Sequence, residues 1–216
     1  AELMSAPANT PLPEGYLLQN YRIERLLSRG GFSFVYLGRD ENEEAVAIKE
    51  YMPNALIVRR EGAGVKLEGD EQQLSTFRQG LRCFFEEGRA LAKIDHPNVV
   101  RVDNFFRANE TVYMVMKYMR GRTLQFHIQN HQQRFNDAFL RRIFLSLLNG
   151  LREVHTHKIV HLDIKPANVY INMDGTPVLL DFGAARQILA SEGQNLRPLY
   201  TAGFAAPEQY HGMQDV

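Results

Sequence analysis

Two short stretches in the second half of the chain carry residue types that can do chemistry. Residues 161–168 read His-Leu-Asp-Ile-Lys-Pro-Ala-Asn, and Asp-Phe-Gly follows at 181–183. A carboxylate can accept a proton, an amine can neutralise negative charge, and amide and carboxylate oxygens suit Mg²⁺. A surface loop, with Asp163 and Asn168 capping turns and Lys165 in solvent, would explain each residue alone but explains the ordered set poorly.

This ordered pair of stretches resembles the catalytic loop and the metal-binding turn of protein kinases. The resemblance implies that Asp163 orients the attacking hydroxyl and accepts its proton, while Lys165 balances charge on the transferred group. It implies that Asn168 and Asp181 hold Mg²⁺, with Mn²⁺ as the alternative ion. Lysine and proline after the aspartate are typical of serine/threonine kinases, so we expect transfer of the γ-phosphate of ATP to protein serine and threonine hydroxyls.

A lysine in the first half fits the same resemblance. Val-Ala-Ile-Lys at 46–49 is similar to the strand motif whose lysine reaches the α- and β-phosphates of ATP and pairs with a glutamate on the next helix. An ordinary strand-end lysine is the plain alternative, but a lysine in so apolar a run needs an anionic partner. We expect Lys49 to pair with Glu87, and Glu86, one position round the helix, is the competing candidate.

The glycine-rich loop of the family is only partly present. Kinases carry Gly-x-Gly-x-x-Gly, whose backbone N–H groups close over the phosphates. Here residues 28–35 read Ser-Arg-Gly-Gly-Phe-Ser-Phe-Val, so only Gly30 stands at a motif glycine, and Ser28 and Ser33 replace the other two. The segment alone fits a phosphate cover and a simple hairpin turn equally well.

The adenine site is expected between the two halves of the chain. By resemblance, four side chains enclose the purine: Val35 and Ala47 as its roof, Tyr170 as its floor and Met116 as its gatekeeper. Backbone groups of Lys117 and Met119 would hydrogen-bond to the purine edge.

The stretch 181–208 resembles a kinase activation segment, which closes with Ala-Pro-Glu at 206–208. Thr201 matches the threonine that contacts the catalytic aspartate in serine/threonine kinases. Leu162 stands where many kinases have an arginine that anchors a phosphate on this segment. We therefore expect little switching by phosphorylation of the segment.

Hydrophobic periodicity predicts the elements that must position these residues. Alternating and β-branched runs predict strands at 21–26, 34–37, 45–48 and 111–116, and shorter ones at 168–172 and 177–180. Apolar residues at three- and four-residue steps predict helices over 77–91 and 140–154. The polar stretch 50–70 is expected to form an exposed hairpin.

This order of elements favours an α+β, protein-kinase-like fold of two lobes: an antiparallel sheet with one main helix, then a mostly helical, incomplete lobe. We expect a leader at 1–20, the first lobe at 21–116, a hinge at 117–121 and the second lobe at 122–216. The family's second lobe continues with several helices beyond the Ala-Pro-Glu motif. Their absence predicts self-association through an exposed apolar face, or a rearranged activation segment.

The composition of the chain argues against some classes of binding partner. Lys and Arg total 25 and so do Asp and Glu, which gives no overall field for nucleic acid or an anionic membrane. No apolar run approaches the ~18 residues of a membrane span. One cysteine, Cys83, excludes an internal disulfide framework and fits a reducing compartment, so we expect a cytoplasmic location. His155, His157 and His161 are poorly spaced for zinc.

Two other classes of function stay open. A kinase-like scaffold would hold nucleotide and act through protein contacts with little transfer, and a small-molecule phosphotransferase would share the fold. Lys165 and the motif at 206–208 argue against the phosphotransferase. Lys-Glu-Tyr-Met-Pro at 49–53 and the long insert before Glu87 resemble bacterial kinases. The residues do not identify the protein substrate.

Overall fold

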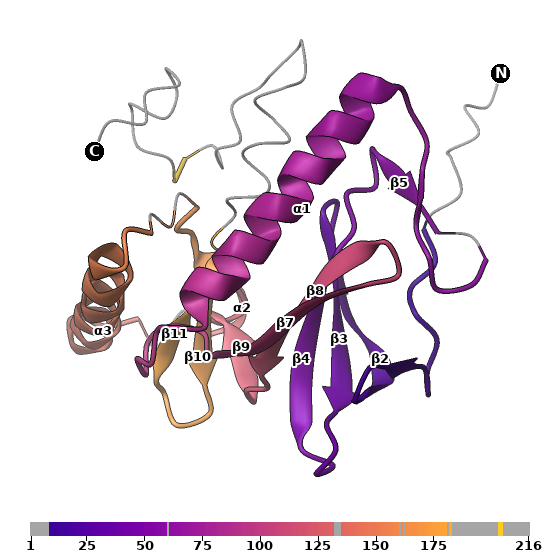
Figure 1. Cartoon of the computed structure of the whole chain (residues 1–216). Helices are drawn as coiled ribbons and strands as arrows, with labels where there is room; N and C mark the ends of the chain where they lie inside the picture. Colours follow the sequence, from indigo (N-terminus) through magenta and orange to yellow (C-terminus); the bar gives the residue numbers. More distant parts are fainter. Residues whose placement is uncertain are drawn as a thin grey trace, which may run out of the picture.

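The computed structural model describes residues 9–59, 61–131, 135–159, 161, 163–180, 182 and 203–204. The first part of the chain is a six-stranded antiparallel sheet with one long helix across it (Figure 1). Its spatial order is β1 (Leu17–Leu18), β2 (Tyr21–Arg29), β3 (Ser33–Arg39), β4 (Ala45–Tyr51), β8 (Thr111–Lys117) and β7 (Val102–Ala108). The helix and β7 therefore intervene in sequence between two neighbouring strands, β4 and β8.

The register of the sheet gathers four predicted site residues on one face. Val35 of β3 stands opposite Lys49 of β4, and Ala47 of β4 stands opposite Met116 of β8. Directly paired residues share a face, as do residues two apart on one strand. All four side chains are only half-buried. The intervening residues of β3 and β4, which point to the other face, are buried throughout.

Helix α1 (Glu71–Leu91) covers the face that carries Lys49. A capping box starts it: the Asp70 carboxylate accepts the N–H of Gln73, and the Gln73 side chain accepts the N–H of Asp70. Apolar residues then recur on one side of the helix, as the sequence predicted. This start and this stripe determine which residues of α1 face the sheet.

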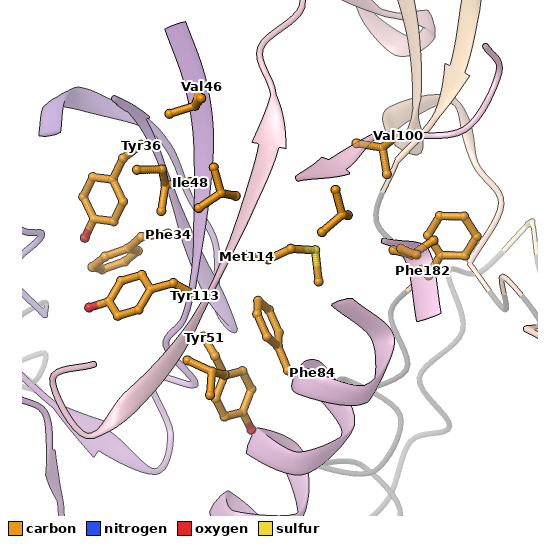
Figure 2. Close-up of a cluster of buried hydrophobic side chains, with 14 of the residues drawn as sticks. Phe34, Tyr36, Val46, Ile48, Tyr51, Phe84, Val100, Tyr113, Met114 and Phe182 are labelled. Atoms are coloured by element: carbon orange, nitrogen blue, oxygen red, sulfur yellow. The ribbon is translucent and has the colours of Figure 1, made fainter. Parts of the chain in front are cut away.

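A glycine lets α1 approach the sheet closely. A Cβ at Gly88 would lie 3.2 Å from the methyl carbon of Met114 and 3.3 Å from the Cβ of Phe105. Figure 2 shows Met114 of β8 and Phe84 of α1 side by side in this core. The close approach sets the distance between the sheet and the neighbouring residue of the helix, Glu87.

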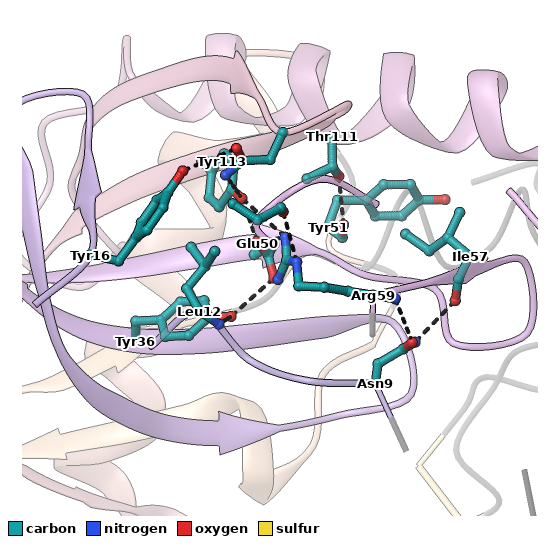
Figure 3. Close-up of polar contacts among 12 residues, drawn as sticks. Asn9, Leu12, Tyr16, Tyr36, Glu50, Tyr51, Ile57, Arg59, Thr111 and Tyr113 are labelled. Atoms are coloured by element: carbon teal, nitrogen blue, oxygen red, sulfur yellow. Dashed lines mark hydrogen bonds and ion pairs between the residues drawn. The ribbon is translucent and has the colours of Figure 1, made fainter. Parts of the chain in front are cut away.

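Residues 9–20 do not form the leader outside the core that the sequence predicted. Leu12 and Leu18 are 4% and 1% exposed and belong to the core. The Asn9 side chain accepts the backbone N–H of Arg59 and donates to a backbone oxygen of the next hairpin (Figure 3). The prediction failed because Pro11 and Pro13 break the periodicity of this segment, which nevertheless covers the second face of the sheet.

A hairpin of β5 (Ile57–Val58) and β6 (Lys66–Leu67) forms within the stretch 50–70, as predicted. Its expected exposure is wrong for the first strand, because Ile57 is fully buried and Arg59 is 1% exposed. Arg59 is drawn inward by a buried carboxylate on β4. The hairpin and residues 9–20 together cover the second face of the sheet.

The second part of the chain holds a smaller antiparallel sheet and two helices (Figure 1). The sheet has the order β11 (Pro177–Leu179), β10 (Val169–Asn172) and β9 (Gly121–Thr123). Helices α2 (Leu124–Asn130) and α3 (Asp137–Thr156) pack against it, and a short 3-10 helix, η2 (Pro166–Asn168), leads into β10. Gly175 supplies the positive φ of +85° in the turn between β10 and β11.

The predicted fold class is confirmed, and most predicted elements are present. The sequence did not predict β7, β9 or α2. In β7 a bulge between Val102 and Asn104 interrupts the period-two pattern that identifies a strand. No helix among the described residues is long and apolar enough to cross a membrane.

Candidate active site

Asp163, Lys165 and Asn168 come together in the loop before β10. Lys165 Nζ lies 3.2 Å from Asp163 Oδ2, and these side chains are 19% and 10% exposed. Asn168 donates its side-chain N–H groups to the backbone oxygen and to Oδ2 of Asp163, at 2.9 and 3.1 Å. Pro166 begins η2, where its fixed φ suits the first helical position. The turn brings the amide of Asn168 back onto the carboxylate.

His161 links this loop to the segment after β11. Its Nδ1 accepts the backbone N–H of Asp163 at 3.3 Å, so the ring proton resides on Nε2, which donates to the Leu180 oxygen at 2.8 Å. The ring lies 4.5 Å from that of Phe182, centroid to centroid. His161 therefore packs against Phe182 in the interior, and it is only 1% exposed.

The residues predicted to bind Mg²⁺ fit that role where they are described. The Asn168 amide nitrogen is used by Asp163, which leaves its oxygen as the donor to an ion. The backbone oxygen of Asn168 accepts the N–H of Leu180 at 2.9 Å, which ties Asn168 to the residue preceding Asp181. Asp181, Leu162, Thr201 and almost all of 181–208 lie outside the described residues.

Lys49 extends from β4 toward α1. Its Nζ lies 5.5 Å from the centre of the Phe84 ring, a cation–π distance. Glu87 is one turn further along α1 and is 9% exposed. The competing candidate, Glu86, points outward and forms an ion pair with Arg89 at 2.8 Å. Burial therefore favours Glu87 over Glu86 as the carboxylate on the Lys49 side of the helix.

The loop between β2 and β3 is held by its own turn and by the chain after β4. The N–H of Gly30 donates to the Ser33 oxygen at 2.9 Å, and Ser28 pairs with Val35 across the two strands. The side chain of Asn54 donates to the Gly30 oxygen at 3.2 Å. This role of Asn54 could not be predicted from a local motif, because the contact spans 24 residues.

A tyrosine joins the predicted floor of the adenine site to the predicted hinge. The hydroxyl of Tyr170 on β10 donates to the Met119 oxygen at 3.2 Å. Burial raises the pKa of this hydroxyl, which keeps it a donor. The N–H of Lys117 donates to the Arg101 oxygen at 3.0 Å. The Tyr170 bond thus ties Met119, between β8 and β9, to β10 of the second sheet, and the sequence did not predict this bond.

The comparisons agree with this geometry. Residues 21–214 match the family described as protein kinase domain, and the chain belongs to that family. Probable serine/threonine-protein kinase PknB of Lactococcus lactis is 28% identical over 195 residues, which cover 89% of this chain and 28% of that protein. Serine/threonine-protein kinase ssn3 of Aspergillus terreus is 30% identical over 200 residues, which cover 89% of this chain and 42% of that protein.

Solved structures show the same likeness. The structure described as PpkA-294 apo form superposes with a TM-score of 0.84 at 34% identity, over 95% of this chain and 73% of that one. The PknI kinase domain of Mycobacterium tuberculosis has a TM-score of 0.63 at 23% identity, over 82% and 63%, and shows the fold alone. The predicted class, a bacterial-type serine/threonine kinase, is confirmed. The chain spans less than half of either curated relative.

Proposed function

We propose that the protein transfers the γ-phosphate of ATP to serine and threonine hydroxyls of a protein substrate. The observation that carries the proposal is the Asp163 carboxylate, held by Lys165 and Asn168. A largely buried ion pair contributes little to folding stability, because desolvation offsets its attraction. The arrangement of Asp163 and Lys165 is therefore better explained by a chemical role of the carboxylate than by a contribution to folding stability.

In this proposal each polar side chain of the loop has a separate role. Asp163 accepts the proton of the attacking hydroxyl, and the two side-chain bonds to its Oδ2 keep the carboxylate oriented for that transfer. Lys165 balances the negative charge that grows on the transferred group. Asn168 positions Asp163 through its amide nitrogen.

The nucleotide would lie between the face of the sheet that carries Lys49 and the floor at Tyr170. Val35, Ala47 and Met116 share that face and are only half-buried, which leaves apolar surface for a purine. Lys49, with Glu87 as its partner, would hold the α- and β-phosphates, and the turn of Ser28, Gly30 and Ser33 would cover them.

Mg²⁺, or Mn²⁺ in its place, would be held by Asn168 and Asp181. The ion would neutralise phosphate oxygens during transfer. Among the described residues no group of three His, Cys, Asp or Glu side chains could hold a metal by itself. The phosphates of the nucleotide would supply further oxygen ligands to an ion held by Asn168 and Asp181.

Paired assays on the purified 216-residue chain test the proposal. We expect MgATP to bind, and mass spectrometry to find new phosphate on serine and threonine of a peptide library. Lys49→Met should weaken nucleotide binding, whereas Asp163→Asn should abolish transfer and leave binding in place. Binding without any transfer, unchanged by Asp163→Asn, would instead favour the kinase-like scaffold.

We also propose that the isolated chain self-associates through α3. Four apolar side chains of this helix are 37–64% exposed: Leu140, Phe144, Leu145 and Leu148. Leu140, Phe144 and Leu148 recur at four-residue steps along one side of the helix, and Leu145 lies next to Phe144. Light scattering should give a mass above 24.8 kDa for the chain, and Leu148→Lys should lower it. Met173→Lys, at a side chain 81% exposed on another element, is the matched control. A monomer at all concentrations would contradict this proposal.

The hinge at 117–121 and the second lobe at 122–216 stay as proposed from the sequence, whereas we propose that the first lobe takes in residues 9–20 as well as 21–116, because Leu12 and Leu18 belong to its core. A cytoplasmic location likewise rests on the single cysteine alone.

A further inference from the structure

A groove outside the catalytic loop combines positive charge with aromatic surface. Its volume is about 670 Å³, and it lies among the chain before β9, helix α2, the start of α3 and the turn between β10 and β11. The volume lies in the range of ~300–1,000 Å³ typical of ligand sites. The groove adjoins the predicted hinge, because Tyr118 and Tyr170 contribute to its lining.

Three arginines supply the charge. Arg120 precedes β9, Arg122 lies on β9 and Arg142 lies on α3, and all three are exposed. None of them forms an ion pair with a described carboxylate, and no described Asp or Glu lines the groove. Because the whole chain has no net charge, this is a local concentration of cations.

Aromatic rings hold two of these guanidinium groups in place. Arg122 Cζ lies 5.3 Å from the centre of the Phe126 ring, and Arg142 Cζ lies 5.6 Å from that of Phe139. Phe139 also meets Phe135 edge to face at 5.2 Å, and both line the groove. The arginines are thereby oriented without an anionic partner, beside apolar surface.

We propose that this groove binds an acidic segment of the protein substrate, outside the residue that is phosphorylated. The carboxylates of the segment pair with Arg120, Arg122 and Arg142, and one of its apolar side chains packs on Phe135 and Phe139. The arginines can bind the carboxylates of a peptide while the aromatic rings contact its apolar side chains. A small inorganic anion would use the arginines alone, so a peptide matches the groove better. That the partner is a substrate rests on the proposed function, whereas the binding itself does not.

Fluorescence anisotropy with a labelled peptide of Glu, Asp, Leu and Phe tests the binding without ATP. Arg122→Glu and Arg142→Glu should each weaken binding by about tenfold or more. Arg78→Glu is the matched control, because Arg78 is an exposed arginine on the outer side of α1. Added salt should weaken binding by the wild type. Circular dichroism checks that each variant is folded.

Further probes make the proposal falsifiable. Equal binding by the charge-reversed variants and the wild type would overturn it. So would equal binding by a polyglutamate without apolar residues, or displacement of the peptide by RNA or anionic vesicles at lower concentration.

A transfer assay separates this proposal from the proposed function. A serine peptide with the acidic–apolar segment attached should show a lower KM than the serine peptide alone, at similar kcat, and Arg142→Glu should remove the difference. If phosphate is transferred but the attached segment has no effect on KM, the proposed binding of substrate in the groove is wrong, whereas the proposed kinase function stands. If the peptide binds in an arginine-dependent way but no phosphate is transferred, the proposed kinase function is wrong, whereas the groove stands as a peptide-binding site.

Discussion

The residues of the catalytic loop show how one amide can serve two purposes. Asn168 donates twice to Asp163, and in the proposed function its side-chain oxygen would bind Mg²⁺. A carboxylate at 168 would keep the metal ligand but lose both donated bonds, and it would place like charges close together. The two roles can therefore be separated by a single substitution.

Asn168→Asp should lower kcat by about 10²-fold, because the position of the Asp163 carboxylate is no longer held. The concentration of Mg²⁺ that gives half-maximal rate should change far less. Steady-state rates over a Mg²⁺ series measure both quantities. A variant with wild-type kcat would show that Asn168 does not position Asp163.

Tyr51 affects the stability of the fold and has no part in the candidate site. It is 1% exposed, and its hydroxyl has no hydrogen-bond partner among the described residues. Burial, and secondarily the nearby Cys83, raise its pKa above the ordinary 10.0. The folded protein therefore favours the neutral hydroxyl of Tyr51. The contribution of this preference to the free energy of unfolding is fully present below pH 10.0 and is lost as the pH rises above it.

Tyr51→Phe should raise the free energy of unfolding near pH 7 by about 1 kcal/mol, since a buried, unbonded hydroxyl is removed. Above pH 10 the free energy of unfolding should fall less steeply with pH for the variant than for the wild type. The two slopes should differ by up to about 1.4 kcal/mol per pH unit. Urea unfolding at several pH values measures both effects. Tyr113→Phe is the contrasting control, because its hydroxyl bonds to Glu50 and its loss should destabilise the fold.

At the scale of elements, one buried ion pair joins three segments. Arg59 donates to both oxygens of Glu50 at 2.8 Å each, and neither side chain is exposed. Tyr36 and Tyr113 also donate to this carboxylate, and Asn9 accepts the backbone N–H of Arg59 (Figure 3). The cluster ties residues 9–20 and the β5–β6 hairpin to β4, the strand that carries Lys49.

Removing one partner of this pair should be costly. Glu50→Ala or Arg59→Ala leaves a buried charge unpaired, and each should lower the free energy of unfolding by about 3–5 kcal/mol. Replacing both residues by methionine should recover much of the loss, because no charge is then buried. Denaturant titration of the four proteins measures the difference. Equal losses for the double and single variants would contradict this explanation.

Local patterns predicted some elements well and others poorly. The period of apolar residues sufficed for α1 and α3, whose ends are marked by caps at Asp70 and Asn136. It failed for residues 9–20, which contact residues distant in sequence, such as the backbone N–H of Arg59 that Asn9 accepts. Glu50 was likewise passed over, since a glutamate on a strand gives no local sign that an arginine nine residues later will neutralise it.

For the whole molecule, the loop residues could be proposed from the sequence because their chemistry is confined to short motifs. Asp163, Lys165 and Asn168 lie within six positions, and their contacts follow from one turn of η2. The groove lined by Arg120 and Arg142 could not be predicted in this way. Its arginines come from separate elements, and only the packing of α3 beside β10 and β11 brings them to one cavity.

The proposed function rests on the Asp163 carboxylate, held by Lys165 and Asn168, as the group that serves phosphoryl transfer. The most direct measurement is single-turnover transfer of γ-phosphate to a serine peptide, comparing the wild type with Asp163→Asn at saturating MgATP. The account predicts a loss of about 10²–10⁴-fold in the transfer rate, with nucleotide affinity within a few-fold of wild type. Equal transfer rates for the two proteins would contradict it.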